Sequence, residues 1–332
     1  MSRVNLLVLG RGTVGSVFVD LVRARDARPK RGPRLALDAI HTRRATYYDR
    51  DGALALGAPL DPYKRVSALA AIGPAVLVDL TAAPEMGELY LHALRQGVSV
   101  VTANKLPLVR RELPLERLLD VAEESGATLK YETTVGADLP VLQPILDRLA
   151  SGDRVVKIEG SLSGSLAFLS SMLNGGSSFE RALEEARALG FTEPDPREDL
   201  SGRDVARKAV ILARTIGVSV ADGAGRREPC LEDVALEPFP VGPPQTAGLV
   251  PNALAYLATI DVLARTPIRV GPALVPHHHP AASLASAESF VAITTARSRV
   301  PLVVRGPGAG ALATASGVLA DVVTAARWSF SR

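Results

Sequence analysis

The sequence predicts an α/β protein in which a Rossmann-type, doubly wound parallel sheet is followed by a second domain of α+β type. In the first third of the chain, short apolar runs alternate with segments of helical spacing. This alternation favours parallel strands with helices on both faces of the sheet. The first run leads directly into a glycine-rich turn, GRGTVG, at 10–15. After Gly136 the pattern changes to longer helices and isolated strands, which indicates a second domain.

The first domain is expected at residues 1–135, and each of its strands is predicted from a short run of apolar residues. The run at 4–9 stops at Gly10, and a segment of helical spacing, SVFVDLVRARD, follows the turn. A helical pattern, EMGELYLHALRQG, separates two of the later runs. The remaining strands are predicted at 35–40, 76–80, 98–102 and 127–132.

The second domain is expected at residues 136–300, with a C-terminal segment at 301–332. Ser177 and Glu180 have the spacing of a capping box, and Gly190 ends the helix that they begin. EPFPVGPPQTAG is rich in proline and glycine and predicts a loop. Helices are predicted for DLPVLQPILDRLA, LAFLSSML, SSFERALEEARALG, DVARKAVILARTIG and GALATASGVLADVVTAARWS, and strands for VVKIEGSLS, SFVAITTA and PLVVRGPG.

Composition excludes several classes of protein. The 332 residues are 47% hydrophobic and 22% charged, which is typical of a folded globular protein. A net charge of +3 with only 4% aromatic residues argues against a nucleic-acid-binding protein. No apolar stretch is long enough to span a membrane, and the first apolar run is too short for a signal peptide. The single cysteine, Cys230, suits a reducing compartment. We therefore expect a soluble, cytoplasmic protein.

The glycine-rich turn predicts a dinucleotide site. It follows a strand and opens a helix, which is the context that allows a pyrophosphate to approach the backbone and the helix N-terminus. A carboxylate at the end of the second strand would bind a ribose hydroxyl, but this chain has His41, Arg43 and Arg44 there. Two guanidinium groups can clamp a 2′-phosphate, so the sequence predicts a preference for NADP(H). The alternatives are a turn without ligand and arginines that are merely solvated.

Asp204 and Lys208 lie four residues apart on a predicted helix, DVARKAVILARTIG. Helical projection puts them on a flank between an arginine stripe, expected to face solvent, and the core face. A lysine on such a flank can transfer protons, and the chain contains only six lysines among its 38 basic residues. The alternative is structural: Asp204 forms a capping box with Ser201 and a surface ion pair with Lys208. The stripe comprises Arg203, Arg207 and Arg214.

Seven segments in a fixed order resemble the homoserine dehydrogenase family. They are GRGTVG, VDLTAA, TANK, YETTVGADLP, GSLSGSLAFLSSML, SFERALEEARALGFTEPDPREDLSGRDVARKAVILA and GPGAGALATASGVLADVV. Together they extend over nearly the whole chain. The resemblance implies interconversion of homoserine and aspartate 4-semialdehyde with NAD or NADP, in the biosynthesis of threonine and methionine. It also implies that the second domain is the catalytic and dimerisation domain, and that the protein is a homodimer.

The resemblance assigns roles to individual residues. It implies that Glu193 and Asp204 bind the substrate, that Lys208 transfers the proton, and that Lys105 lies near the nicotinamide. The C-terminal segment is expected to return to the dinucleotide-binding domain. Together with the residues of the glycine-rich turn and the two arginines, the cofactor-binding residues expected are Gly10, Gly12, Thr13, Val14, Gly15, Arg43, Arg44, Thr81, Lys105, Gly190 and Gly308.

The resemblance also implies a site for a monovalent cation in YETTVGADLP. The carboxylate of Glu132 and the carbonyls of Val135, Ala137 and Leu139 would supply the oxygens that a hard cation such as Na⁺ or K⁺ needs. The alternative is an interdomain hinge that binds no ion, because backbone ligands leave little trace in a sequence.

Some features depart from the family, and other classes of protein compete. Phe191 stands where the family commonly has tyrosine, and the chain ends soon after TAARWS, so we expect no appended regulatory domain. An aspartate-semialdehyde dehydrogenase would need a cysteine nucleophile, and Cys230 lies in REPCLED without the context of one. A non-enzymatic NADP sensor would keep the glycine-rich turn but would need neither Lys105 nor Lys208.

Overall fold

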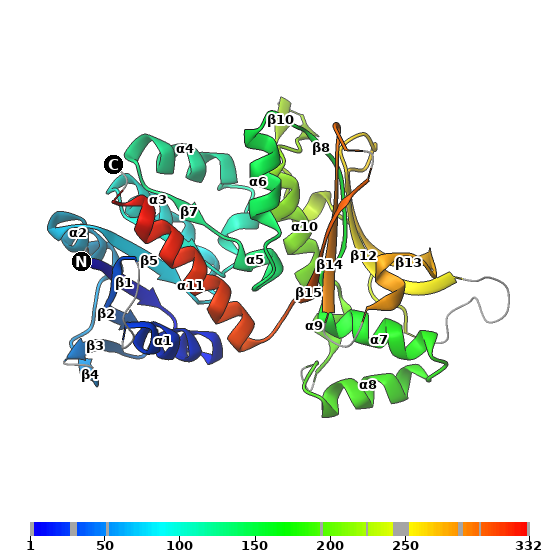
Figure 1. Cartoon of the computed structure of the whole chain (residues 1–332), viewed down its shortest axis with the longest axis horizontal. Coiled ribbons are helices and arrows are strands. Elements are labelled where there is room, and N and C mark those ends of the chain that lie inside the picture. Colours follow the sequence, from blue (N-terminus) through cyan, green and yellow to red (C-terminus); the bar gives the residue numbers. More distant parts are fainter. Residues whose placement is uncertain are drawn as a thin grey trace. The chain divides into compact units, whose positions relative to one another are not determined.

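The chain forms two compact units in a computed structural model (Figure 1). The first unit contains Met1–Asp138 and Gly310–Arg332, and the second contains Leu139–Ala309. The structure describes residues 3–26, 32–50, 53–192, 195–223, 225–241, 252–284, 288–298 and 300–330.

The first unit is built on a seven-stranded sheet in the order β4-β3-β2-β1-β5-β6-β7. Five strands are parallel, and β3 and β4 extend the sheet in antiparallel fashion beyond β2. Chain order reverses between β1 and β5, which makes their carboxyl ends the topological switch point where ligands bind in such sheets. The strands are β1 (Arg3–Leu9), β2 (Arg34–His41), β3 (Thr46–Arg50), β4 (Ala53–Gly57), β5 (Ala75–Asp79), β6 (Ser99–Thr102) and β7 (Leu129–Lys130).

Helices cover both faces of this sheet, as a doubly wound fold requires. On one face, α1 (Thr13–Asp26) packs beside the C-terminal helix α11 (Ala311–Trp328), drawn in blue and red in Figure 1. On the other, α2, α3 and α4 follow one another. Those three helices are α2 (Pro62–Ile72), α3 (Gly87–Arg95) and α4 (Leu115–Ser125), and the shorter elements are η1 (Pro84–Met86), η2 (Pro107–Val109) and α5 (Thr133–Gly136).

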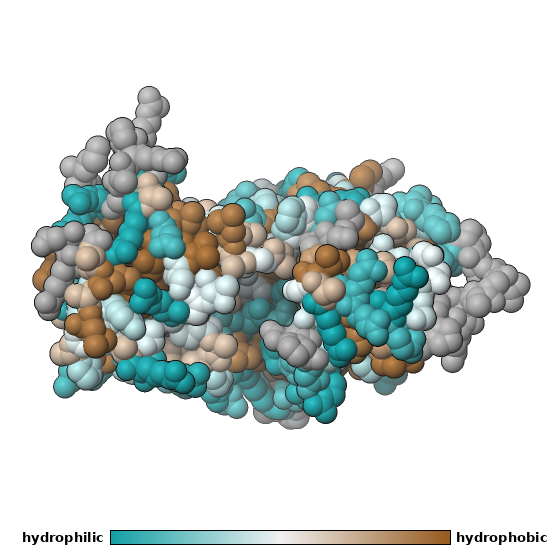
Figure 2. Space-filling view, turned by 90° about the horizontal axis from the view of Figure 1, so that it is seen from below, coloured by the Kyte–Doolittle hydropathy of each residue, from teal (hydrophilic) through white to brown (hydrophobic). Residues whose placement is uncertain are grey.

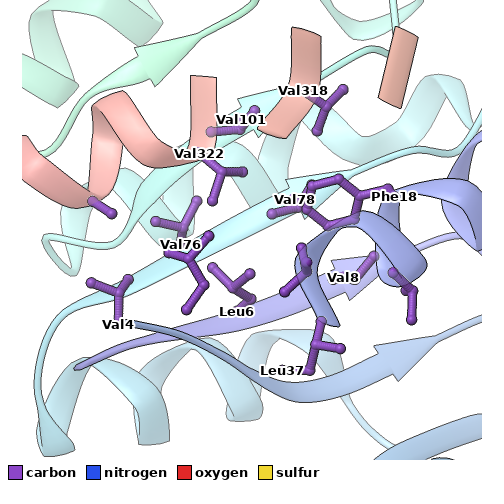
Figure 3. Packing of buried hydrophobic residues seen from close by; sticks show 14 of the residues in the cluster. Val4, Leu6, Val8, Phe18, Leu37, Val76, Val78, Val101, Val318 and Val322 are labelled. Atoms are coloured by element: carbon purple, nitrogen blue, oxygen red, sulfur yellow. The ribbon is translucent and has the colours of Figure 1, made fainter. Parts of the chain in front are cut away.

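Apolar side chains beneath α1 and α11 form a core that joins distant parts of the sequence (Figure 3). Alternate residues of a strand point to the same face, so β1 and β5 each present several valine or leucine side chains to the two helices. Full burial of one such side chain stabilises the fold by about 1.5–3 kcal/mol. The labelled members include Val4, Leu6, Val8, Phe18, Val76, Val78, Val101, Val318 and Val322.

The second unit is an α+β domain with a six-stranded sheet in the order β11-β13-β12-β8-β14-β15. Neighbouring strands are antiparallel except β11 and β13. A short hairpin, β9–β10, lies apart from this sheet. The strands are β8 (Val155–Ser161), β9 (Val220–Asp222), β10 (Gly225–Arg227), β11 (Ala235–Leu236), β12 (Asn252–Asp261), β13 (Ile268–Pro276), β14 (Glu288–Thr295) and β15 (Leu302–Pro307).

The helices of the second unit include α10, which carries Asp204 and Lys208. Among them, α10 packs against β12 and β13, and α7 packs against β12 and α8. The helices are α6 (Leu142–Ala150), α7 (Gly164–Asn174), α8 (Phe179–Ala188), α9 (Arg197–Leu200), α10 (Arg203–Thr215), η3 (Leu231–Asp233) and η4 (Pro280–Ser283).

The predicted fold class is confirmed, and the structure corrects several details. The cap of α8 is Ser178, whose Oγ accepts from Arg181 N at 3.3 Å, and not Ser177. Residues 302–307 pair with β14, so this part of the C-terminal segment belongs to the second unit. The hairpins β3–β4 and β12–β13 were not predicted. Among the described residues, no helix has the length and apolar character needed to cross a membrane.

Gly202, between α9 and α10, lies in a tightly packed part of the second unit, where a larger residue would be destabilising. Its φ is +70°, and an added Cβ would overlap the Tyr256 hydroxyl. Gly217 has φ +74°, but nothing lies within 4 Å of its Cβ position. We expect Gly202→Ala to lower the free energy of unfolding by roughly 2–4 kcal/mol, from backbone strain and overpacking together. Gly217→Ala should cost about 1–2 kcal/mol from backbone strain alone. Urea denaturation measures both.

The double variant Gly202→Ala/Tyr256→Phe is the control. In this double variant the overlapping hydroxyl is absent. Once the effect of Tyr256→Phe alone has been subtracted, its free energy of unfolding should exceed that of Gly202→Ala. If the two glycine variants have equal stability, the packing described around Gly202 is wrong.

Candidate active site

The glycine-rich turn joins β1 to α1, and each of its three positions is glycine for a different physical reason. Gly10 has φ +94°, and an added Cβ would lie 2.8 Å from the Leu80 carbonyl oxygen. An added Cβ at Gly15 would overlap the Gly10 carbonyl, which fixes the start of α1 close to the turn. Gly12 is exposed, and its Cβ position has no neighbour within 4 Å. The turn is therefore tightly packed at Gly10 and Gly15 but accessible at Gly12. Gly12 directly precedes the first residues of α1, Thr13 and Val14, so a pyrophosphate could approach the backbone and the helix N-terminus there.

The link between β2 and β3 lies beside this turn. Gly10 N donates to the His41 carbonyl at 2.9 Å. The hydroxyl of Thr42 accepts from the backbone nitrogens of Arg44 and Ala45, which holds the link in a tight turn. Arg43 and Arg44 are both exposed. These contacts place two guanidinium-bearing residues next to the glycine-rich turn.

His41 ends β2 at the position where a ribose-binding carboxylate would stand. Its Nδ1 lies 3.0 Å from the Thr46 hydroxyl. Burial lowers the pKa of His41, so the ring is neutral at neutral pH. Residues 41–46 contain no carboxylate, so the local charge comes from the two arginines.

A buried carboxylate, Asp79, organises the loops at the carboxyl ends of β5 and β6. One of its oxygens accepts from Thr81 N at 2.8 Å, and the other from the Tyr90 hydroxyl and from Asn104 Nδ2 at 3.0 Å. Burial raises the pKa of Tyr90 well above its usual value, and the negative charge of Asp79 adds to the effect, so Tyr90 remains a donor. The side chain of Asn104 also accepts from Leu106 N at 3.1 Å. The two loops that carry Thr81 and Lys105 are thereby fixed.

Lys208 is held within the second unit by contacts that include a backbone carbonyl and a carboxylate. Its side chain is only 12% exposed, and Nζ donates to the Leu162 carbonyl at 2.7 Å. The Asp204 carboxylate lies 3.4 Å from the same nitrogen and is 48% exposed. Leu162 follows β8 directly, so the lysine joins α10 to the loop that enters α7. Glu193 lies outside the described residues.

Two comparisons with known proteins decide the family. The sequence profile described as "Homoserine dehydrogenase" matches residues 140–323, and "Homoserine dehydrogenase, NAD binding domain" matches residues 10–132. The homoserine dehydrogenase of Saccharomyces cerevisiae is 30% identical over 98% of this chain and 98% of its own length. The chain belongs to the homoserine dehydrogenase family. The predicted membership, and with it a family of NAD(P)-dependent oxidoreductases, is confirmed.

Other relatives of the family differ in extent. A bifunctional aspartokinase/homoserine dehydrogenase 2 from Arabidopsis thaliana is 37% identical, and the match covers 76% of this chain but only 29% of that protein. Among solved structures, a mutant of a hyperthermophilic archaeal homoserine dehydrogenase in complex with NADPH has a TM-score of 0.78 and 25% identity. That match covers 97% of each chain.

The start of α10 differs from the capping box that the spacing of Ser201 and Asp204 predicts. The N-cap is Gly202, without a side-chain cap. Ser201 instead donates to the Glu198 carbonyl and accepts from Arg203 N, so the predicted capping box of Ser201 and Asp204 is wrong.

The predicted solvent stripe of arginines is also wrong at one of its three positions. Arg203 is exposed and Arg207 half-buried, but the side chain of Arg214 is 1% exposed. Its guanidinium donates to the Pro229 carbonyl at 2.8 Å and pairs with Glu228 at 3.3 Å. The segment that follows β10 covers this part of α10, which helical projection alone does not reveal.

Gly190 and Gly308, which the resemblance implies at the cofactor, and Phe191, which departs from the family, have defined local contacts. Gly190 ends α8 with φ +72°, and the ring of Phe191 packs on Phe168 with centroids 5.1 Å apart. A Cβ at Gly308, directly after β15, would overlap the Ser289 hydroxyl of β14, so close packing explains this glycine within the second unit.

The expected cation loop contains an acidic neighbour that the sequence did not indicate. Glu132 N donates to Asp321 Oδ2 of α11 at 3.2 Å. Burial, and then the charge of Glu132, raise the pKa of Asp321 to about 7, against the opposing effect of Lys130. Ala137 has φ +54°, the one positive φ of a residue other than glycine in the described part of the chain. Leu139 is the first residue of the second unit.

Cys230 is a buried thiol with a structural environment. It is 1% exposed, and its backbone nitrogen donates to the Asp233 carboxylate at 2.8 Å, which also binds Arg227. Burial and the neighbouring Glu232 and Asp233 raise the pKa of Cys230 to about 12. A nucleophilic thiolate needs a lowered pKa, so these surroundings do not support the reading as an aspartate-semialdehyde dehydrogenase.

We predict that the thiol of Cys230 is unreactive in the folded protein. At pH 8 its raised pKa keeps the thiolate fraction near 1 in 10⁴, compared with about one quarter for an ordinary cysteine. Ellman's reagent should therefore react more than about 100-fold more slowly with the native protein than with free cysteine. In guanidinium chloride one thiol per chain should react at once. Rapid labelling of native protein would contradict the described burial.

Proposed function

We propose that the chain is a homoserine dehydrogenase that interconverts L-homoserine and L-aspartate 4-semialdehyde, as a step in threonine and methionine biosynthesis. The observation that carries the proposal is the environment of Lys208, an ammonium group withdrawn from solvent between the Leu162 carbonyl and Asp204. A lysine is costly to bury, so a nearly buried one in the most specific family segment indicates a role in chemistry.

In the proposed oxidation, a hydride and a proton leave the substrate for two different acceptors. A nicotinamide cofactor, when bound, would supply the acceptor for the hydride of the carbinol carbon in the oxidation and the hydride donor in the reduction. Lys208, as a neutral amine, accepts the hydroxyl proton as the carbonyl of the aldehyde forms. In the reduction its ammonium donates that proton to the forming alkoxide and stabilises the negative charge. Lys105, in the loop after β6, is assigned a second catalytic role from the family resemblance alone.

Asp204 and Glu193 are proposed to bind the substrate. Both are acidic, which suits the ammonium group of an amino acid. Asp204 is half-exposed and close to Lys208 Nζ, so it can contact a substrate while it keeps the lysine oriented. Glu193 is assigned from the family resemblance alone.

The proposed cofactor is NADP(H), with NAD(H) as the less favoured alternative. The support is the pair Arg43 and Arg44 beside the glycine-rich turn, and a neutral His41 where a ribose-binding carboxylate would stand. The archaeal relative solved with NADPH is consistent with this preference. Gly10, Gly12, Gly15, Thr13, Val14, Thr81, Gly190 and Gly308 complete the proposed contacts.

A monovalent cation is proposed at the loop of Glu132, Val135, Ala137 and Leu139. The support is electrostatic: Asp321 and Glu132 bring two carboxyl groups together in a poorly solvated region. A single positive charge bound there would reduce their repulsion, and oxygen ligands suit Na⁺ or K⁺.

The proposal extends to assembly and location. A homodimer through the second unit is supported by large apolar residues that are exposed on it, including Leu274, Leu302 and Val303. The face in Figure 2 shows hydrophobic and hydrophilic residues intermingled. A cytoplasmic location is supported by the single, buried thiol of Cys230.

Turnover of homoserine tests the proposal. We expect Lys208→Ala to lower kcat for homoserine oxidation by about 10²–10⁴-fold, because the proton loses its acceptor. Lys208→Arg should be similarly impaired, since a guanidinium does not give up its proton near neutral pH. The matched control is Lys157→Ala, which removes a lysine of the same unit that pairs with Glu159 and should keep near wild-type turnover. Full activity of Lys208→Ala would exclude the mechanism, and absence of turnover in the wild type would exclude the function.

Salt-dependent stability tests the cation. At equal ionic strength, NaCl or KCl should raise Tm over choline chloride by roughly 2–4 °C in the wild type, because an ion that binds only the folded state stabilises it. The difference should vanish in Glu132→Gln and persist in the control Glu123→Gln, which alters an exposed carboxylate on α4. Equal Tm values of the wild type in all three salts would rule out an occupied site.

A further inference from the structure

We propose that Arg11, stacked on the ring of Tyr47, selects the 2′-phosphorylated adenosine of NADP(H) and is a third guanidinium beside Arg43 and Arg44. The inference rests on the proposed function, whose cofactor preference it explains with a residue outside the link between β2 and β3. It assigns a specificity-determining role to the second residue of the glycine-rich turn.

The stack is a defined contact in the first unit. The Arg11 Cζ atom lies 4.6 Å from the centroid of the Tyr47 ring. Tyr47 belongs to β3, pairs with Ile40 of β2, and packs at the edge of the core under α1 and α11. The ring is thus held by the sheet, while Arg11 is exposed to solvent. A fixed platform orients a side chain that would otherwise be free to move.

The position of the stack indicates the adenosine end of the cofactor. Arg11 lies between Gly10, which donates to the His41 carbonyl, and Gly12, whose Cβ side is open. β1 and β2 both end at this edge of the sheet, next to the switch point between β1 and β5. Arg11 therefore connects the glycine-rich turn, where a pyrophosphate would bind, with the link that carries Arg43 and Arg44.

The chemistry of guanidinium favours a phosphate as the partner. Stacking uses the flat face of the group and leaves its edge, with several N–H donors, available for phosphate oxygens. Among the residues that the structure describes, no carboxylate pairs with Arg11, and the only nearby acid of β3, Asp49, faces Arg23 at 3.5 Å. The cation is therefore available to an anionic ligand, and a dianionic 2′-phosphate benefits more from it than a neutral ribose hydroxyl.

Binding of cofactor fragments tests the inference without the need for turnover. Calorimetry at fixed ionic strength compares adenosine 2′,5′-bisphosphate with adenosine 5′-monophosphate, and NADPH with NADH. Arg11→Ala should weaken binding of the bisphosphate and of NADPH about tenfold or more. It should weaken binding of the monophosphate and of NADH less than about threefold. Arg11→Lys should lie between, because it keeps the charge but not the planar group.

Three further variants separate the stack from general charge. Tyr47→Phe keeps the ring and should bind as the wild type does, whereas Tyr47→Leu should lose part of the preference for the bisphosphate. Arg95→Ala removes an exposed arginine from the end of α3, at the opposite edge of the sheet, and should leave every affinity unchanged. Tm values close to the wild type verify that the variants are folded.

The outcomes distinguish the inference from the function on which it rests. If the wild type prefers 2′-phosphorylated ligands and Arg11→Ala keeps the full preference, the role of Arg11 is overturned and the proposed cofactor preference stands. If Arg11→Ala weakens all four ligands equally, Arg11 serves the shared part of the cofactor and the inference fails. Equal binding of both ligand types by the wild type overturns the cofactor preference and the inference together. Absence of homoserine turnover, by contrast, overturns the proposed reaction and leaves the binding result intact.

Discussion

The buried carboxylate of Asp79 is the constraint on which the geometry of the first unit depends. A carboxylate removed from water must be compensated by hydrogen bonds, and here Thr81 N, Tyr90 and Asn104 provide them. These donors come from the loop after β5, from α3 and from the loop after β6. The carboxylate can be satisfied only when all three elements are in place, so one charge fixes the edge of the sheet where Thr81 and Lys105 are found.

Much of the first unit could be predicted from the sequence, because its strands are short, apolar and bounded by turns. β12 was missed because NALAYLATID is alanine-rich and buried at most positions, so neither alternation nor β-branched composition marks it. The hairpin β3–β4 was missed as well, since its two strands pair with β2 and with each other through backbone contacts. Strands whose stability comes from neighbours leave a weak local signal.

Within the candidate site, the sequence indicated residue types better than their partners. Lys208 and Asp204 were singled out by spacing, and they lie 3.4 Å apart. The acceptor of the lysine, however, is a backbone carbonyl 46 positions away, and no periodicity reveals such a contact. Arg214 was assigned to solvent because a projection describes one helix in isolation, whereas the segment after β10 covers that helix. Asp321 was missed because α11 returns from the far end of the chain.

The return of α11 has a consequence for how the protein is made. Its Val318 and Val322 complete the core that contains Val4 and Val76 (Figure 3), so the first unit lacks part of its interior until α11 has left the ribosome. The second unit is continuous from Leu139 to Ala309 and can fold during synthesis. While residues 139–309 are being synthesised, the apolar face of the sheet that α11 will cover stays exposed on the nascent chain. Chaperone binding would be most useful during that interval.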